Sequence, residues 1–320
     1  MKMKIYILSA ILIVCFALPL KAELMQETVD SMFVIASSGA MKYRDMVQPT
    51  IEDMAAYEAE IVPFLIEKLN TTDARERMTL EQIFRKIKEP AVPLLNETLI
   101  NDPDSMRLSR VALMLFYIPD TSSVTNLLTV VNHSYYWLRY EAVRALGKIG
   151  DTRGKDAVVN ALKDENELVR TIAAVSCGRM IHDKELFKIL VPMFDDPYYG
   201  VRFSSMESLK DLDCEIKQDN IFDALKKAKS DFQKSYLSLL MAEDSCLYDI
   251  KKVEKSFDLM RFGDAVKTLW KSDCAEAIRY GTFSYKQIDS PDLAETRQRE
   301  LNRLISEMPP CEKATPADSR

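Results

Sequence analysis

The stretch YYWLRYEAVRALGKIGD, residues 135–151, contains the pattern that decides the fold. Its apolar residues recur at steps of three and four, which predicts a helix with one apolar face. These residues are Leu138, Ala142, Val143, Leu146 and Ile149. Glycine and aspartate at the end of the stretch predict a turn, and KDAVVNALKDE, residues 155–165, predicts a second helix. One unit of the chain is therefore a helical hairpin.

The hairpin recurs along the chain at a nearly constant interval. An apolar residue followed by arginine is spaced by 32, 31 and 32 residues, at Met106-Arg107, Leu138-Arg139, Val169-Arg170 and Val201-Arg202. A single pair of such helices is too small to bury its own apolar face, so neighbouring hairpins must stack and share a core. The 29% of charged residues, the 8 glycines and the lack of alternating strand patterns agree with helices throughout. The predicted fold class is all-α, a solenoid.

The repeated phrase resembles the HEAT-repeat family in its short bacterial form, which is related to the repeats of phycobilin lyases. An apolar residue, arginine, a helix of small residues and Ile-Gly-Asp carry the resemblance, best in residues 138–151 and partly in 169–183 and 201–213. Pro119 and His182 depart from the pattern, because they replace the turn glycine. The resemblance implies a right-handed α-α superhelix of about five to seven helical hairpins.

The resemblance also implies a structural ladder in which arginines are linked to turn aspartates. Its members would be Arg107, Arg139, Arg170 and Arg202 with Asp120, Asp151 and Asp183. An arginine at the start of a packed helix must reach solvent or be paired, and its planar fork satisfies several acceptors at once. A second interpretation, a row of arginines that reads an anionic ligand, is less favoured by an acidic chain.

The order of segments predicts an exported protein. We expect a signal peptide in residues 1–22, an N-terminal cap and irregular first repeat in 23–72, HEAT-like repeats in 73–236, a divergent C-terminal cap in 237–308 and a disordered tail in 309–320. The apolar part of the first segment is shorter than the ~20 residues of a membrane span. Cleavage after Ala22 and a periplasmic location are therefore expected, with a retained membrane anchor as the alternative.

Net charge limits the classes of partner. Removal of residues 1–22 takes away three lysines and no acid, which leaves 40 basic and 49 acidic side chains and a formal charge of −9. That balance disfavours nucleic acid and anionic lipid as partners. We expect a monomer that binds an unidentified protein partner and does not insert into the membrane after cleavage.

The cysteines and histidines give little support for catalysis. Cys177 lies on a predicted core face, where a buried free thiol is expected, whereas Cys246 and Cys274 are the hypothetical disulfide pair. His133 and His182 are the only histidines and fall in turns. Deoxyhypusine hydroxylase, a HEAT-like enzyme, holds iron with His-Glu pairs, but here Ser134 and Asp183 follow the histidines. No catalytic residue, cofactor or metal site is predicted.

Two aromatic groups between repeats are the candidate partner-binding residues. They are Tyr135, Tyr136 and Trp137, and Tyr198 and Tyr199. Tyrosine and tryptophan are enriched at interface hot spots, although the same rings also fill gaps between stacked helices. The sequence favours a non-enzymatic exported scaffold that binds another protein. The alternatives are a phycobilin lyase-like enzyme or accessory subunit, and an activity in the divergent C-terminal helices.

Overall fold

The structure is a computed structural model that describes residues 23–243, isolated positions between 263 and 278, and residues 291–310. Residues 1–22, most of the predicted C-terminal cap and residues 311–320 lie outside this description. The chain divides into two compact units, Met1–Ile149 and Gly150–Arg320. Every regular element in the described parts is helical, which confirms the predicted all-α solenoid of hairpins.

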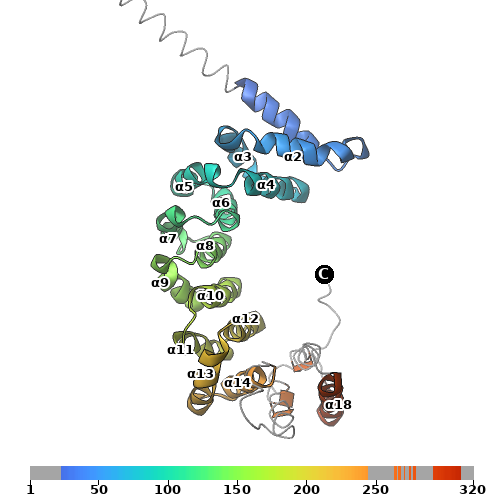
Figure 1. Cartoon of the computed structure of the whole chain (residues 1–320), viewed down its shortest axis with the longest axis vertical. Helices are drawn as coiled ribbons and strands as arrows, with labels where there is room; N and C mark the ends of the chain where they lie inside the picture. Colours follow the sequence, from blue (N-terminus) through green and yellow to red (C-terminus); the bar gives the residue numbers. More distant parts are fainter. Residues whose placement is uncertain are drawn as a thin grey trace, which may run out of the picture. The chain divides into compact units, whose positions relative to one another are not determined.

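The first unit begins with a cap helix over residues 23–36 and then stacks hairpins. Its helices are α2 (Val47–Ala55), α3 (Val62–Glu67), α4 (Ala74–Ile87), α5 (Val92–Asn101), α6 (Ser105–Tyr117), α7 (Val124–Val130) and α8 (Tyr136–Ile149). The first helices of successive hairpins, α4, α6 and α8, form one row, and the second helices α3, α5 and α7 lie along it (Figure 1). Each hairpin therefore buries its apolar face against the next one.

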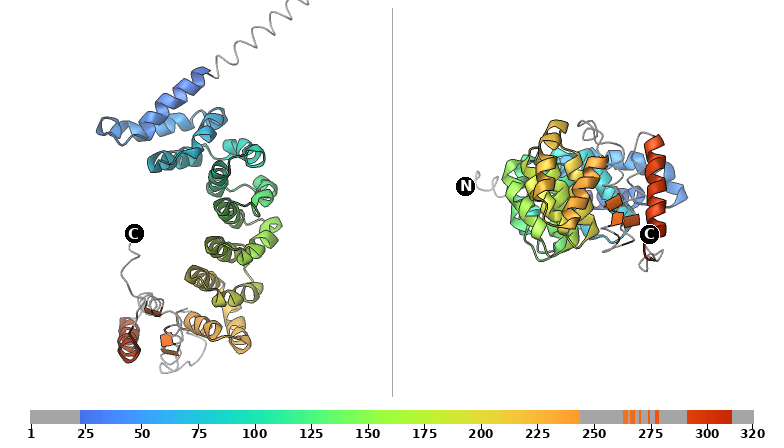
Figure 2. Two further views of the ribbon diagram at one scale, coloured as in Figure 1. Left: turned by 180° about the vertical axis from the view of Figure 1, so that it is seen from behind. Right: turned by 90° about the horizontal axis from the view of Figure 1, so that it is seen from below.

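The second unit repeats this arrangement. Its helices are α9 (Lys155–Asn160), α10 (Glu167–Met180), α11 (Glu185–Leu190), α12 (Tyr199–Lys210), α13 (Cys214–Lys227), α14 (Asp231–Glu243) and α18 (Pro291–Glu307). Helix α10 packs on α12, and α11 packs on α13, as both views of the ribbon show (Figures 1 and 2). Short 3-10 turns extend α9 and α11, through Ala161–Lys163 and Val191–Asp195.

The core consists of the residues that the sequence pattern marks as apolar. In α8, Leu138, Ala142, Val143 and Leu146 are almost completely buried. In α10, Val169, Ala173 and Cys177 are fully buried at the same helical spacing. The repeat period of about 31 residues thus reports the stacking of one hairpin on the next.

The ladder arginines bind the linker in front of their own helix. Arg139 Nη1 donates to the carbonyl oxygens of His133 at 2.8 Å and Ser134 at 3.1 Å. Arg170 Nη1 does the same with Asp164 at 2.9 Å, and Arg202 Nη1 donates to the carbonyl of Asp196. Each of these arginines thereby fastens the start of a packed helix.

The predicted pairing of the arginines with the turn aspartates is wrong. Arg170 forms a two-pronged ion pair with Asp196 of the next linker, Nε to Oδ2 at 2.7 Å and Nη2 to Oδ1 at 3.0 Å. Arg107 pairs with Asp102, Nη1 to Oδ2, at 2.9 Å. The carboxylates that pair with these two arginines are therefore in the linkers, at Asp102 and Asp196, and not in the turns.

The turn aspartates cap helices instead. Asp120 accepts the N–H of Ser122 at 2.7 Å, and Asp183 accepts that of Glu185 at 2.7 Å. Asp151 accepts both the N–H and the guanidinium of Arg153 at 2.8–2.9 Å. An aspartate directly before a helix satisfies N–H groups that have no partner within the helix. These three carboxylates, which we expected to pair with the ladder arginines, therefore bind N–H groups two residues further along the chain.

A second regular feature, absent from our sequence predictions, lies in the linkers. One side-chain acceptor per repeat receives the N–H of the residue two positions later, at 2.7–3.1 Å. The acceptors are Thr71, Asp102, His133, Asp164 and Asp196. His133 fills this role through Nδ1.

Candidate functional site

An aromatic group marks the start of α8. The ring centroids of Tyr136 and Trp137 are 5.0 Å apart, those of Tyr135 and Tyr136 are 6.1 Å apart, and Trp137 meets Tyr140 edge-on at 5.5 Å. The hydrogen bond from Tyr135 N–H to His133 Nδ1 fixes the backbone of the linker at the first residue of the aromatic group. Trp137 stays 38% exposed. The Trp137 ring is therefore open to solvent at the N-terminal end of α8, beside half-buried tyrosines.

Beside these rings lies a pocket of about 350 Å³, which we call the Trp137 pocket. Side chains of α4, α6 and α8 and of the linker before α8 form its wall. They are Arg77, Met106, Ser109, Arg110, Tyr135, Trp137 and Glu141. All of them belong to the first unit. The pocket combines apolar and aromatic walls with two guanidinium groups and one carboxylate, a composition typical of recognition sites.

Charge in the pocket wall is only partly balanced. The Glu141 carboxylate accepts from Arg144 Nη1 at 3.2 Å, and the Arg144 guanidinium also covers the Phe116 ring at 3.9 Å. Burial raises the pKa of Glu141, whereas the charges of Arg144 and Arg110 oppose that rise. One carboxylate thus lies between two arginines.

Our sequence predictions included Tyr135 and Trp137 of this pocket but missed Arg77, Arg110 and Glu141. A signal was present, since Arg110 and Glu141 are 31 residues apart, within one residue of the spacing between Arg107 and Arg139. Residues at nearly the same register on stacked first helices become neighbours. The candidate Tyr136 contacts Trp137 but does not line the pocket.

Tyr198 and Tyr199 occupy the corresponding register in the second unit. Tyr198 N–H donates to Asp196 at 2.8 Å, as Tyr135 does to His133, and Tyr198 is 40% exposed. A Cβ at Gly200 would come within 2.7 Å of the Tyr198 ring, so the glycine lets this ring lie against its own helix. Tyr199 stacks on Phe203, with centroids 5.8 Å apart. Both rings of this pair lie against residues of their own helix, and neither lines the Trp137 pocket.

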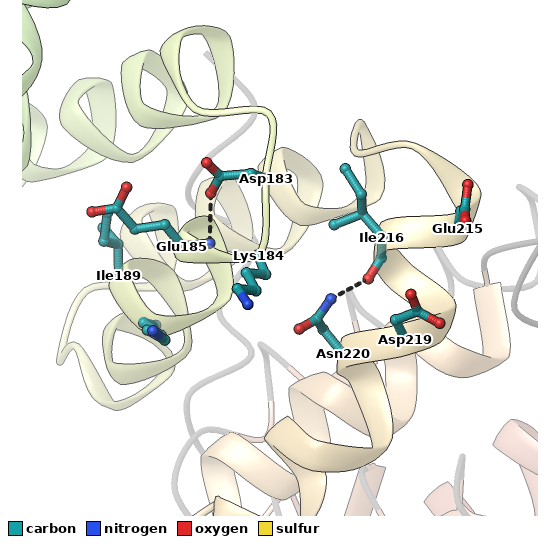
Figure 3. A pocket seen from close by; sticks show the side chains of 9 residues that line it. Asp183, Lys184, Glu185, Ile189, Glu215, Ile216, Asp219 and Asn220 are labelled. Atoms are coloured by element: carbon teal, nitrogen blue, oxygen red, sulfur yellow. Dashed lines mark hydrogen bonds between the residues drawn. The ribbon is translucent and has the colours of Figure 1, made fainter.

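A wider hollow lies between α11 and α13 of the second unit (Figure 3). It has a volume of about 650 Å³, and its wall carries four carboxylates and two lysines. Glu185 N–H donates to Asp183 at 2.7 Å, and Asn220 donates to the carbonyl of Ile216 at 2.7 Å. Most of these side chains are exposed. The hollow is a solvated groove between second helices and has no convergent set of buried polar groups.

The cysteines do not form a reactive site in the described parts of the chain. Cys177 is free and fully buried, and burial raises its pKa to about 12. Cys214 is free and exposed. Cys274 is disulfide-bonded. Cys246 lies outside the described residues, so its pairing with Cys274 stays a prediction.

Metal-binding clusters and membrane-spanning helices are both absent from the described residues. No group of three or more His, Cys, Asp or Glu side chains is placed to hold a metal ion. No helix there combines the length and the apolar character of a membrane span.

Among the solved structures to which the chain is similar are two of similar extent. An engineered protein is 12% identical with a TM-score of 0.37, and the match covers 88% of this chain and 90% of that one. Human deoxyhypusine hydroxylase in complex with glycerol is 12% identical with a TM-score of 0.34, covering 79% of this chain and 99% of that one. No curated protein matches the sequence.

The family comparison agrees with the architecture. Residues 124–210 match the model described as HEAT repeats. This segment runs from α7 to α12 and contains the most regular copies of the helical hairpin. The matched segment and the stacked hairpins show that the chain contains HEAT repeats.

Proposed function

We propose that this HEAT-repeat chain is an exported, non-enzymatic scaffold that binds another protein through the Trp137 pocket and the rings around it. The observation that carries the proposal is the exposed Trp137 ring beside a pocket with two arginines. Aromatic and arginine side chains dominate the binding energy of protein interfaces. The helices beneath them are fixed by a buried core, so little order has to be gained on binding.

The test compares substitutions of two aromatic residues of similar exposure, one in each unit. Immobilised wild type should retain one partner in stoichiometric amount from an envelope extract. Trp137→Ala should lose that partner while keeping its helical circular dichroism, because the ring is exposed and contributes little to the core. Tyr198→Ala, the matched control in the second unit, should retain it. Retention by Trp137→Ala, or a bound small molecule in place of a protein, would argue against the proposal.

Export is proposed from residues 1–22 and has its own test. The chain isolated from a bacterial host should begin at Glu23 by intact mass, and it should appear in the periplasmic fraction. Full-length mass in the membrane fraction would favour the anchor interpretation. This result leaves the binding proposal unaffected, since the Trp137 pocket lies within the described part of the first unit.

A further inference from the structure

The arginines of the Trp137 pocket have donor groups to spare. Arg110 Nε is buried and has no hydrogen-bond partner among the described residues. Arg77 donates through Nη1 to the carbonyl of Thr72, and the described residues supply it with no ion-pair partner. A buried guanidinium donor without a partner loses the hydrogen bonds that water would give it. The Nη groups of Arg110 are not covered in this way and also have no partner among the described residues, so a ligand in the pocket that accepts from them would supply the missing hydrogen bonds.

Two other arginines nearby, Arg85 on α4 and Arg144 on α8, have partners for their guanidinium groups. Arg85 lies over the Tyr117 ring at 3.8 Å. Arg144 has both Glu141 and the Phe116 ring. Arg107 Nε on α6 is also buried without a partner, but Arg107 does not line the pocket; Arg77 and Arg110 do, together with Tyr135 and Trp137.

The charge and size of the pocket define the class of ligand. Arg77 and Arg110 line the pocket with one carboxylate, Glu141, and Arg144 already pairs with that carboxylate, so the lining carries an excess of positive charge although the chain as a whole is acidic. Planar guanidinium forks suit carboxylates, which accept two parallel hydrogen bonds. A volume of about 350 Å³ exceeds what one carboxylate fills. Met106 and the two rings offer apolar surface for the remainder of the ligand.

We propose that the Trp137 pocket binds an acidic segment of a protein partner, with an Asp or Glu carboxylate on Arg110 and Arg77 and an adjacent apolar side chain against Trp137. This inference rests on the proposed function, because it gives the chemistry of the partner at the same surface. Charge complementarity selects this occupant over a neutral segment.

A defined peptide pair tests the charge requirement. The probe is a fluorescein-labelled hexapeptide of alternating glutamate and phenylalanine, and its control carries glutamine for each glutamate. Fluorescence polarisation with the purified chain should give at least about tenfold tighter binding of the glutamate peptide, the effect of one charge-assisted hydrogen bond. Binding should weaken as salt rises.

Substitutions then locate the contact. Arg110→Gln should raise the dissociation constant of the glutamate peptide about tenfold. Arg77→Gln, nearer the solvent, provides a second variant if the first folds poorly. Arg75→Gln is the matched control, since this exposed arginine lies on α4 outside the pocket. It should bind like wild type.

Two results would overturn the inference. One is equal affinity of wild type for both peptides, or unchanged binding by both Arg110→Gln and Arg77→Gln. The other is complete competition by inorganic phosphate at the peptide's own concentration, which would make this a small-anion site. If either occurs while Trp137→Ala still loses the envelope partner, the scaffold proposal survives and only the acidic chemistry fails.

Discussion

At the scale of single residues, the arginine of each repeat stabilises the solenoid by satisfying backbone and carboxylate acceptors together. Arg170 shows this most fully, because its three nitrogens reach two linker carbonyls and both oxygens of Asp196. Both partners are largely buried. Removal of such a side chain leaves a buried carboxylate and two carbonyls without their donor.

Arg170→Gln should therefore lower the free energy of unfolding by about 3 kcal/mol, the typical cost of breaking one side of a buried pair. Urea denaturation followed by circular dichroism measures it. Arg153→Gln is the control, since that arginine pairs with Asp151 at the exposed surface and should change stability little. Equal effects of the two substitutions would mean that the ladder contact contributes no more than a surface pair.

At the scale of elements, the turn between the two helices of a hairpin decides where the first helix ends. Gly150 follows α8 with φ +73°, and Lys88 occupies the equivalent place after α4 with φ +62°. The two positions are 62 residues apart, two repeat periods. Only glycine adopts positive φ without steric cost. Lys88 is therefore a strained residue at a position where its relative has glycine.

Lys88→Gly should raise stability by about 1 kcal/mol, the lower end of the cost of such a conformation. Gly150→Ala should lower it by a similar amount. Melting temperatures of the two single variants check both signs in one experiment. If Lys88→Gly destabilises the chain, the flexibility that glycine adds to the unfolded state outweighs the relief of strain.

The aspartates that cap the helices make the stability of the fold depend on pH. Hydrogen bonds from N–H groups and neighbouring side chains lower the pKa of four capping aspartates, which are Asp73, Asp104, Asp120 and Asp151, to about 2 in Asp151. An unfolded aspartate titrates near ~3.9. The unfolded chain then binds more protons in this range, so the stability that the caps give is complete above about pH 4 and is lost toward pH 2.

The urea midpoint should accordingly fall as the pH drops from about 4 to 2. Asp104→Asn retains a capping side chain without a titrating group, so its midpoint should fall less steeply than that of wild type. Glu141 acts in the opposite direction, because its raised pKa favours folding at low pH. Parallel slopes for wild type and Asp104→Asn would show that this cap does not contribute to the acid sensitivity.

At the scale of the whole molecule, the parts that repeat were predictable and the parts that combine several helices were not. Burial follows a period of about 31 residues, so the hairpins and apolar faces such as that of α8 could be read from spacing. The partner of Arg170 could not, since the choice between Asp183 and Asp196 depends on local turn geometry. The Trp137 pocket draws Arg77, Arg110 and Glu141 from three helices, and the division after Ile149 leaves no mark in the repeated phrase.

Stacked hairpins touch only their neighbours, so damage to the core should remain local. Phe194 is fully buried in the second unit, stacked on Tyr236 with centroids 4.8 Å apart, and Phe84 is fully buried in the first. Phe194→Ala removes about 3–5 kcal/mol of packing and should speed amide hydrogen exchange in α12, α13 and α14 while α4 and α6 keep wild-type protection. Phe84→Ala should give the reverse pattern, with faster exchange in α2, α4 and α6. Uniform loss of protection in both variants would mean that the two units unfold as one cooperative body, and that the nearest-neighbour description of this solenoid does not hold.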